Sequence, residues 1–180
     1  ESGTIIDVAN VTGLTLKGLA IQSPTGDACG GSRTGVSIAS STGVSLQKLS
    51  LRATGTATLT GCTLDTGITS SASATTISGG SIVDFSSDGV VAYSGGSLLV
   101  DGLSLTFAHA AESPATIANG INAQSGAAVT LRNVTIGGPA TAGVSTSLLS
   151  KGIQDWAPGM VIENATISRV RTAIEVDNGD

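Results

Sequence analysis

Apolar residues recur along the chain in a six-residue motif, apolar-x-x-apolar-x-apolar, which predicts short strands. Its first positions lie at residues 16, 46, 77, 100, 131 and 162, so the steps are 30, 31, 23, 31 and 31 residues. The alternation in Leu19-Ala20-Ile21 directs aliphatic side chains inward and small ones outward. A repeat of this length indicates a solenoid, in which each coil buries its apolar face against the next.

A second motif, glycine followed by an apolar residue, lies between copies of the first: Gly35-Val36, Gly67-Ile68, Gly89-Val90, Gly120-Ile121 and Gly152-Ile153. From its apolar residue to the next first motif the distance is 9 or 10 residues, whereas the other half of each repeat varies from 7 to 17. The constant half predicts two strands and a tight turn that superpose from coil to coil, and the variable half predicts a loop that leaves the rod. Equivalent aliphatics then stack about 4.8 Å apart, and parallel crossovers favour right-handed winding.

These patterns predict an all-β fold, a right-handed parallel β-helix (solenoid) of about six coils that is open at both ends. Residues 1–180 are expected to form a single segment of a longer solenoid, because both ends fall in mid-coil. Further coils, neighbouring protein segments or other subunits are therefore expected to cover the open ends, which would otherwise expose unpaired backbone.

The third position of the first motif predicts a sharp bend between two strands. It is occupied by Gly18, Lys48, Gly79, Gly102, Asn133 and Asn164. Glycine and asparagine tolerate the left-handed backbone conformation that such a bend requires. Lys48 departs from this pattern, so we expect strain or an altered bend there, whereas Asn133 and Asn164 could form a short amide ladder.

Composition narrows the range of partners. Hydrophobic residues make up 40% of the chain, but aromatic residues only 2%, which favours a narrow interior filled by Val, Ile and Leu. The net charge of -5 argues against a nucleic-acid partner, which would require clustered Lys and Arg. No apolar run approaches the roughly 18 residues of a membrane span.

The spacing of the two motifs resembles the pectin-lyase-like superfamily of right-handed parallel β-helix proteins over almost the whole chain. The resemblance implies a groove along the outside of the rod, where such enzymes use Asp-bound calcium with an Arg or Lys base, or several Asp residues with an adjacent Asp pair and a Gly-His-Gly. This chain has no Asp-Asp pair and no Gly-His-Gly. Its single histidine, His109, lies among small residues, and a surface histidine without a catalytic role is the favoured interpretation.

The two cysteines, Cys29 and Cys62, precede successive second motifs by 7 and 6 residues, which places them one coil apart. We favour a disulfide between them, with two buried free thiols as the alternative. A disulfide would imply an oxidising, extracytoplasmic location. Three N-x-S/T sequons, at Asn10, Asn133 and Asn164, are candidate glycosylation sites, of which Asn10 is favoured because the other two occupy the predicted bend.

Asp84 and Asp88 form the strongest local candidate for chemistry. They lie in the short loop of the 23-residue coil, between two long excursions, which predicts a notch in the wall of the rod. Two carboxylates there could bind calcium or act as an acid/base pair. The favoured alternative is that both cap the turn around Ser86 and Ser87, and no cofactor is otherwise expected.

Tyr93, Gln124 and Trp156 each follow a second-motif apolar residue by three positions. An outward column of these residues, about 5 Å per step, could stack on sugar rings or contact a protein. The alternative is that Trp156 covers the bend before Pro158, and Asp155, at a position predicted to point inward, puts the register in doubt there.

Three functions are compatible with the sequence. The favoured one is a non-catalytic structural or adhesive rod, extracellular or at the cell surface, whose loops and ends contact proteins or glycans. The second is a fragment of a polysaccharide lyase or glycoside hydrolase that acts on an acidic polysaccharide. The third is a carbohydrate-binding β-helix.

Overall fold

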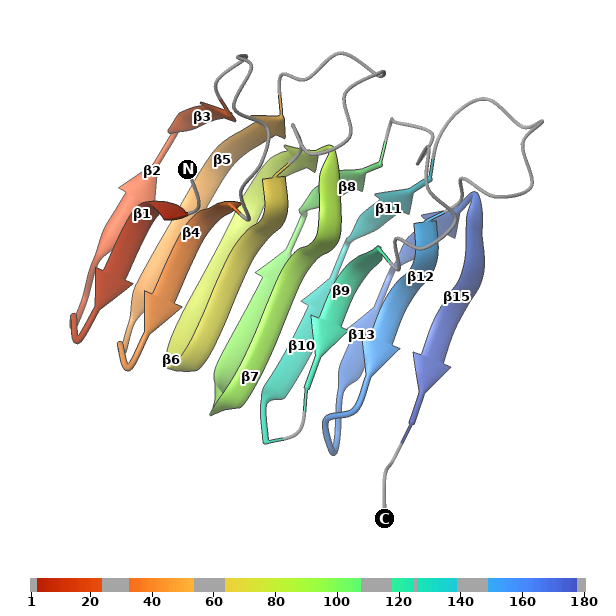
Figure 1. Cartoon of the computed structure of the whole chain (residues 1–180). Coiled ribbons are helices and arrows are strands. Elements are labelled where there is room, and N and C mark those ends of the chain that lie inside the picture. Colours follow the sequence, from red (N-terminus) through yellow and green to blue (C-terminus); the bar gives the residue numbers. More distant parts are fainter. Residues whose placement is uncertain are drawn as a thin grey trace.

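The computed structural model describes residues 3–23, 33–53, 64–107, 118–124, 126–138 and 149–177. This part of the chain is all-β, contains no helix and winds into a parallel solenoid with three faces (Figure 1). The predicted fold class is therefore confirmed. The described residues amount to about four turns. This count differs slightly from the expected six coils, although the bend of the first motif is present at six successive levels.

Face 1 carries the second motif. Its strands are β1 (Gly3–Ala9), β4 (Arg33–Ala39), the start of β6 (Leu64–Val83), the start of β7 (Phe85–Asp101), β9 (Asn119–Ala123), β12 (Leu149–Asp155) and β15 (Val170–Val176).

Faces 2 and 3 carry the two halves of the first motif. Face 2 consists of β2 (Thr15–Lys17), the start of β5 (Val44–Ala53), the middle of β6, the end of β7, β10 (Ala128–Arg132) and β13 (Val161–Glu163). Face 3 consists of β3 (Ala20–Ser23), the ends of β5 and β6, β8 (Ser104–Thr106), β11 (Thr135–Gly137) and β14 (Thr166–Ser168).

The winding is right-handed. In Figure 1 the strands of face 1 run downward at the front, the strands behind them run upward, and successive levels advance from red at the left to blue at the right. Every strand pairing is parallel, as the predicted crossovers require.

Aliphatic side chains stack in continuous files, as predicted. Strand register aligns the first positions of the first motif in the order Leu16, Leu46, Ile77, Val100, Leu131 and Ile162. The four inner members of this file are 0% exposed, whereas the outermost two are only partly buried. This file of the core is therefore fully buried at the four central levels and partly exposed at the two terminal levels.

The bend between faces 2 and 3 is left-handed at all six levels, which confirms the prediction. The φ angles are 66°, 64° and 71° at Gly18, Gly79 and Gly102, and 52° and 55° at Asn133 and Asn164. Lys48 adopts the same bend with φ 51°, so the departure in sequence produces local backbone strain and not an altered turn.

The predicted amide ladder forms along this bend. Asn164 Nδ2 donates a hydrogen bond to Asn133 Oδ1 at 3.4 Å, and Asn133 Nδ2 donates to Asp101 Oδ1 at 2.8 Å. The ladder links three successive levels along the exposed edge of the rod.

A file of glycines brings successive levels of face 1 close together. A Cβ atom on Gly67, Gly89 or Gly120 would lie 2.5–2.6 Å from the carbonyl oxygen of the next glycine in the file. The same atom would point at a core side chain, such as Ile136 Cγ2 at 2.7 Å from the Cβ of residue 120. The second motif therefore requires glycine at this position, because there is no space for a side chain.

The register holds at Asp155, where the sequence left it in doubt. Asp155 pairs with Ala123 on one side and Val176 on the other, and its side chain is 8% exposed. Its Oδ1 accepts a hydrogen bond from the backbone N–H of Ala157 at 2.9 Å, which provides a partner for a carboxylate between two aliphatic neighbours.

Candidate functional site

Polar residues converge on the outer surface of face 1, over β7, β9, β12 and β15. Two columns of register partners form this surface. The first runs through Asp88, Asn119 and Lys151, and the second runs through Asn122, Gln154 and Glu175. Because adjacent levels are about 4.8 Å apart, the parallel stack brings together side chains that lie more than 80 residues apart in sequence. We call these six residues the face 1 polar cluster.

Asp88 is the centre of this cluster. Its Oδ1 accepts hydrogen bonds from Asn119 Nδ2 at 2.9 Å and from Asn122 Nδ2 at 3.1 Å. Its Oδ2 accepts a hydrogen bond from Ser87 Oγ at 3.1 Å. Both carboxylate oxygens are thus engaged, and the two amides are fixed in one orientation, because exchanging O and N in either would place two acceptors against each other.

The same geometry leaves two acceptors without partners. Asn119 and Asn122 are only 5% and 7% exposed, and the Oδ1 atom of each is buried with no hydrogen-bond partner. Since both amide nitrogens face Asp88, both oxygens point away from its carboxylate. Buried amide oxygens without donors are costly, so these two atoms are the acceptors of the cluster that are available to an additional donor.

Lys151 and Gln154 border the amides at the next level. Lys151 Nζ lies 2.6 Å from Glu175 Oε1. When the O and N atoms of the Gln154 amide are assigned by their hydrogen-bond neighbours, its oxygen accepts from Lys151 Nζ at 2.8 Å and from Trp156 Nε1 at 3.2 Å. Its nitrogen then lies 3.2 Å from Asn119 Nδ2. The ammonium group is therefore already neutralised by a carboxylate, and the indole is positioned at the edge of the cluster.

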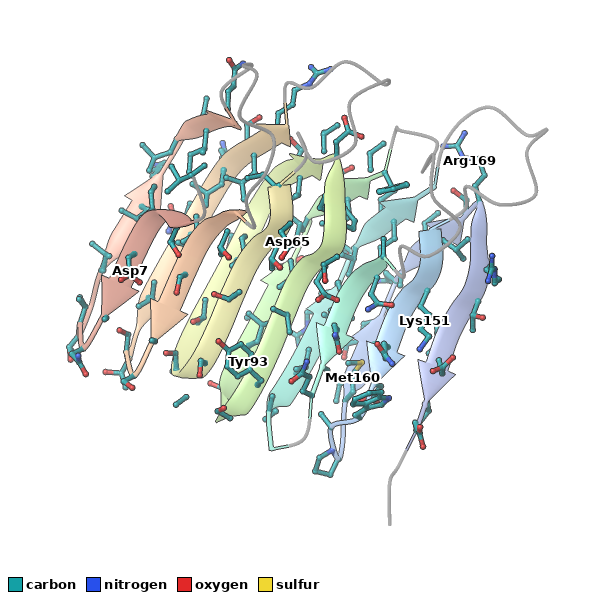
Figure 2. The ribbon with its side chains drawn as sticks, in the orientation of Figure 1. Asp7, Asp65, Tyr93, Lys151, Met160 and Arg169 are labelled. Carbon is teal, nitrogen blue, oxygen red and sulfur yellow. The ribbon has the colours of Figure 1, made fainter. Side chains whose placement is uncertain are left out.

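Tyr93, Gln124 and Trp156 occupy consecutive levels of one column, as their spacing predicted. The backbone N–H of Gln124 donates to Ala92 O at 2.8 Å, and that of Trp156 donates to Ala123 O at 2.7 Å. Trp156 is 45% exposed, whereas Tyr93 and Gln124 are partly buried. Figure 2 shows Tyr93 and Lys151 on the same front surface of the rod. The column of Tyr93, Gln124 and Trp156 meets the polar cluster at Trp156, whose Nε1 lies 3.2 Å from the Gln154 amide.

Asp84 and Asp88 have different environments. Asp84 is 3% exposed, lies between β6 and β7 with φ 62°, and donates its backbone N–H to Thr106 O at 3.0 Å. Asp88 lies on β7, and its carboxylate is engaged by Ser87 and the two amides. Within the described ranges, no group of three or more His, Cys, Asp or Glu residues is arranged to hold a metal ion.

The remaining candidates are at corners or outside the described residues. Asn10, Asn133 and Asn164 are exposed, and Asn10 has φ 57° at the turn that follows β1. Cys29, Cys62 and His109 lie outside the described residues. The disulfide, the glycans and the role of the histidine stay predictions.

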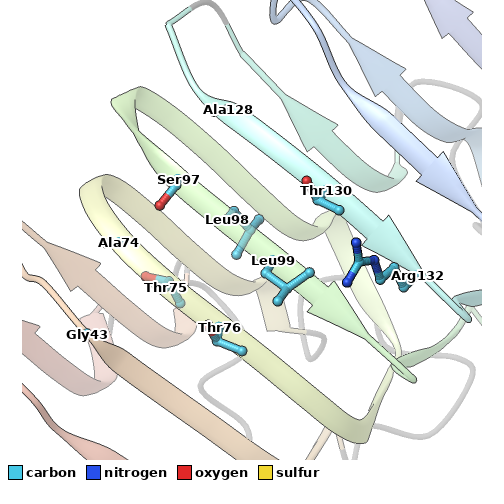
Figure 3. A pocket seen from close by; sticks show the side chains of 10 residues that line it. All are labelled: Gly43, Ala74, Thr75, Thr76, Ser97, Leu98, Leu99, Ala128, Thr130 and Arg132. Atoms are coloured by element: carbon cyan, nitrogen blue, oxygen red, sulfur yellow. The ribbon is translucent and has the colours of Figure 1, made fainter.

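Face 2 carries a second, shallower feature. A groove of about 370 Å³ runs across β6, β7 and β10 (Figure 3). Its lining includes Thr76, Leu99 and Thr130. Its charged lining residue, Arg132, has its Nε 2.9 Å from Glu163 Oε2. Small aliphatic and hydroxyl side chains dominate this groove, so it offers less directed chemistry than face 1.

Sequence reasoning found Asp88 but missed Asn119, Asn122, Lys151 and Gln154. A signal was present, because the first column holds the residue immediately before each second-motif glycine, and the second column holds the residue after each apolar position. In the other described levels these positions hold mainly hydroxyl residues such as Thr66 and Thr69, with Asp7 in β1 as an exception, so amides and charges are concentrated in one stretch of the rod.

Comparison with known proteins adds no relative, since the chain matches no protein-family profile, no curated protein and no solved structure. In the part of the chain that is described, no helix is long and apolar enough to cross a membrane.

Proposed function

We propose that this chain is a segment of a non-catalytic, extracellular or cell-surface β-helix rod, of the pectin-lyase-like type, that contacts glycans through face 1. In this proposal the stacked core supplies a rigid scaffold, and the exposed Trp156 with the partly buried Asp88, Lys151 and Glu175 of the face 1 polar cluster supplies the contact surface. Neighbouring protein segments or subunits at the ends belong to the same proposal. Exposed apolar residues at the terminal levels support that part, including Ile5 at 42% and Val176 at 59% exposure.

One observation carries the glycan-binding part. Directed amides and an exposed indole share one surface, with Trp156 Nε1 bonded to Gln154 beside two amide oxygens that have no donor. Sugar recognition combines an aromatic ring, on which the apolar side of a sugar packs, with planar polar groups that bond its hydroxyls. At other described levels of the second column the residues are mainly small, such as Ser37 and Thr69.

The engagement of the titratable groups supports a non-catalytic role. Asp88 accepts hydrogen bonds at both oxygens, and Lys151 is paired with Glu175. A general acid or base must be within reach of the substrate proton that it transfers. Here the Asp88 carboxylate and the Lys151 ammonium group are held by hydrogen bonds and an ion pair to neighbouring side chains. Such contacts suit a rigid binding surface.

The second candidate is a fragment of a polysaccharide lyase or glycoside hydrolase. The observation in its favour is that Asp88, Lys151 and Glu175 lie on one face within a few successive levels. A Lys base and carboxylates on the outer face of a rod are the residue types that such chemistry uses. The calcium site considered for Asp84 and Asp88 belongs to this candidate.

A single set of incubations separates the two candidates. The purified chain is mixed with insoluble and soluble plant and microbial polysaccharides, and both retention and released products are measured. Retention that is lost in Trp156→Ala but kept in Asn133→Gly, with no new reducing ends or unsaturated products, is expected. Asn133→Gly is the matched control because it removes an exposed side chain from another part of the rod at φ 52°, which glycine tolerates. Polysaccharide cleavage that is lost in Asp88→Asn would contradict the non-catalytic role.

A further inference from the structure

The charge balance of the face 1 polar cluster allows a more specific statement, which rests on the proposed function. Asp88 and Glu175 contribute two carboxylates, and Lys151 contributes the single ammonium group of the cluster, at 2.6 Å from Glu175. The positive charge is therefore already balanced, and the Asp88 carboxylate remains as the excess charge. An approaching anion would meet no unpaired cation in this cluster.

The groups that lack partners point in the same direction. Asn119 Oδ1 and Asn122 Oδ1 are acceptors, and their amide hydrogens are already directed at Asp88 Oδ1. A carboxylate ligand offers only acceptors and would leave both oxygens unsatisfied, whereas a hydroxyl offers a donor. Because these oxygens are buried, Asn119 and Asn122 must shift toward the surface for a ligand hydroxyl to donate to them.

From these contacts we infer that face 1 binds a neutral, hydroxyl-rich sugar and discriminates against sugars that carry carboxylates. The indole of Trp156, 45% exposed and fixed by its bond to Gln154, lies beside one pyranose ring. Hydroxyls of the adjoining ring donate toward Asn119 and Asn122. Asp88 and the two amides provide this discrimination, and all three residues lie on strands of face 1.

The test measures binding of two hexasaccharide types to the full chain by calorimetric titration. The neutral probes are glucan, galactan and mannan hexamers, and the acidic probe is an oligogalacturonate hexamer. We expect at least one neutral hexamer to bind, and the acidic hexamer to bind about tenfold more weakly or not at all.

Two variants assign the selectivity to the cluster. Asn122→Ala is expected to weaken binding of the neutral hexamer about tenfold, since it removes an acceptor and one donor to Asp88. Glu175→Gln is expected to narrow the gap between neutral and acidic hexamers, because it frees the Lys151 ammonium group. Asn133→Gly, at the bend between faces 2 and 3, is the control, and circular dichroism verifies the fold of every variant.

The outcomes distinguish the two levels of the proposal. Tighter binding of oligogalacturonate than of every neutral hexamer would overturn the selectivity and leave glycan binding in place. Binding of no hexamer would overturn both the selectivity and the glycan-binding function. Neutral binding that is unaffected by Asn122→Ala would show that the sugar lies elsewhere on the rod, and would also overturn the inference.

Discussion

Replacing Gly120 by alanine tests the close stacking of face 1 most directly. The new Cβ would lie 2.5 Å from Gly152 O and 2.7 Å from Ile136 Cγ2, roughly an ångström closer than ordinary contacts. One of these groups belongs to the backbone ladder and the other to the sealed core, so neither can move without disturbing a neighbouring level. Overpacking of this kind costs about 1–3 kcal/mol, and we expect the upper part of that range.

The structure also supplies graded controls. Gly3 lies in β1, and a Cβ atom added there would have no other atom within 4 Å, so Gly3→Ala should leave stability unchanged or raise it by up to about 1 kcal/mol. Gly35 is intermediate, because its Cβ would lie 2.7 Å from Gly67 O but 3.3 Å from the nearest core atom. The expected order of destabilisation is therefore Gly120, then Gly35, then Gly3.

Urea unfolding measures these differences. With an m-value of about 2 kcal/mol/M, a loss of about 2–3 kcal/mol lowers the midpoint by about 1–1.5 M. Circular dichroism reports the strands, and the single tryptophan, Trp156, reports the end of β12 by its fluorescence. Coincident transitions justify a two-state treatment. Equal midpoints for Gly120→Ala and Gly3→Ala would refute the argument, since the clash would then be relieved without cost.

Three further variants test the bend, the core and the surface. Lys48→Gly should stabilise the rod by about 0.5–1 kcal/mol in urea unfolding, because it removes left-handed strain at φ 51°, whereas Lys17→Gly within β2 should destabilise it. Leu131→Ala should cost about 2–5 kcal/mol, and clearly more than Ile162→Ala at a partly exposed level; equal losses would contradict the sealed core. Arg132→Ala should change stability by less than about 1 kcal/mol, and about 1 M salt should abolish the difference, because its ion pair is half exposed.

Local periodicity alone determined the architecture. A strand with alternating inward and outward residues cannot bury its apolar side by itself, so a regular repeat of such strands must stack. The first positions from Leu16 to Ile162, and the left-handed bends from Gly18 to Asn164, were therefore readable from spacing and residue type. The amide ladder of Asn133 and Asn164 followed from the same register.

Only the tertiary structure decided what occupies the outer surface of face 1. Asp88, Asn119 and Lys151 are ordinary surface residue types when taken singly, and their spacing in sequence depends on loops of variable length. Parallel stacking converts them into direct neighbours, and hydrogen bonds to Asp88 then fix which amide atoms are left without a partner. Fold is thus encoded in the repeat, whereas the candidate site arises from residues that vary between repeats and meet only across the stack.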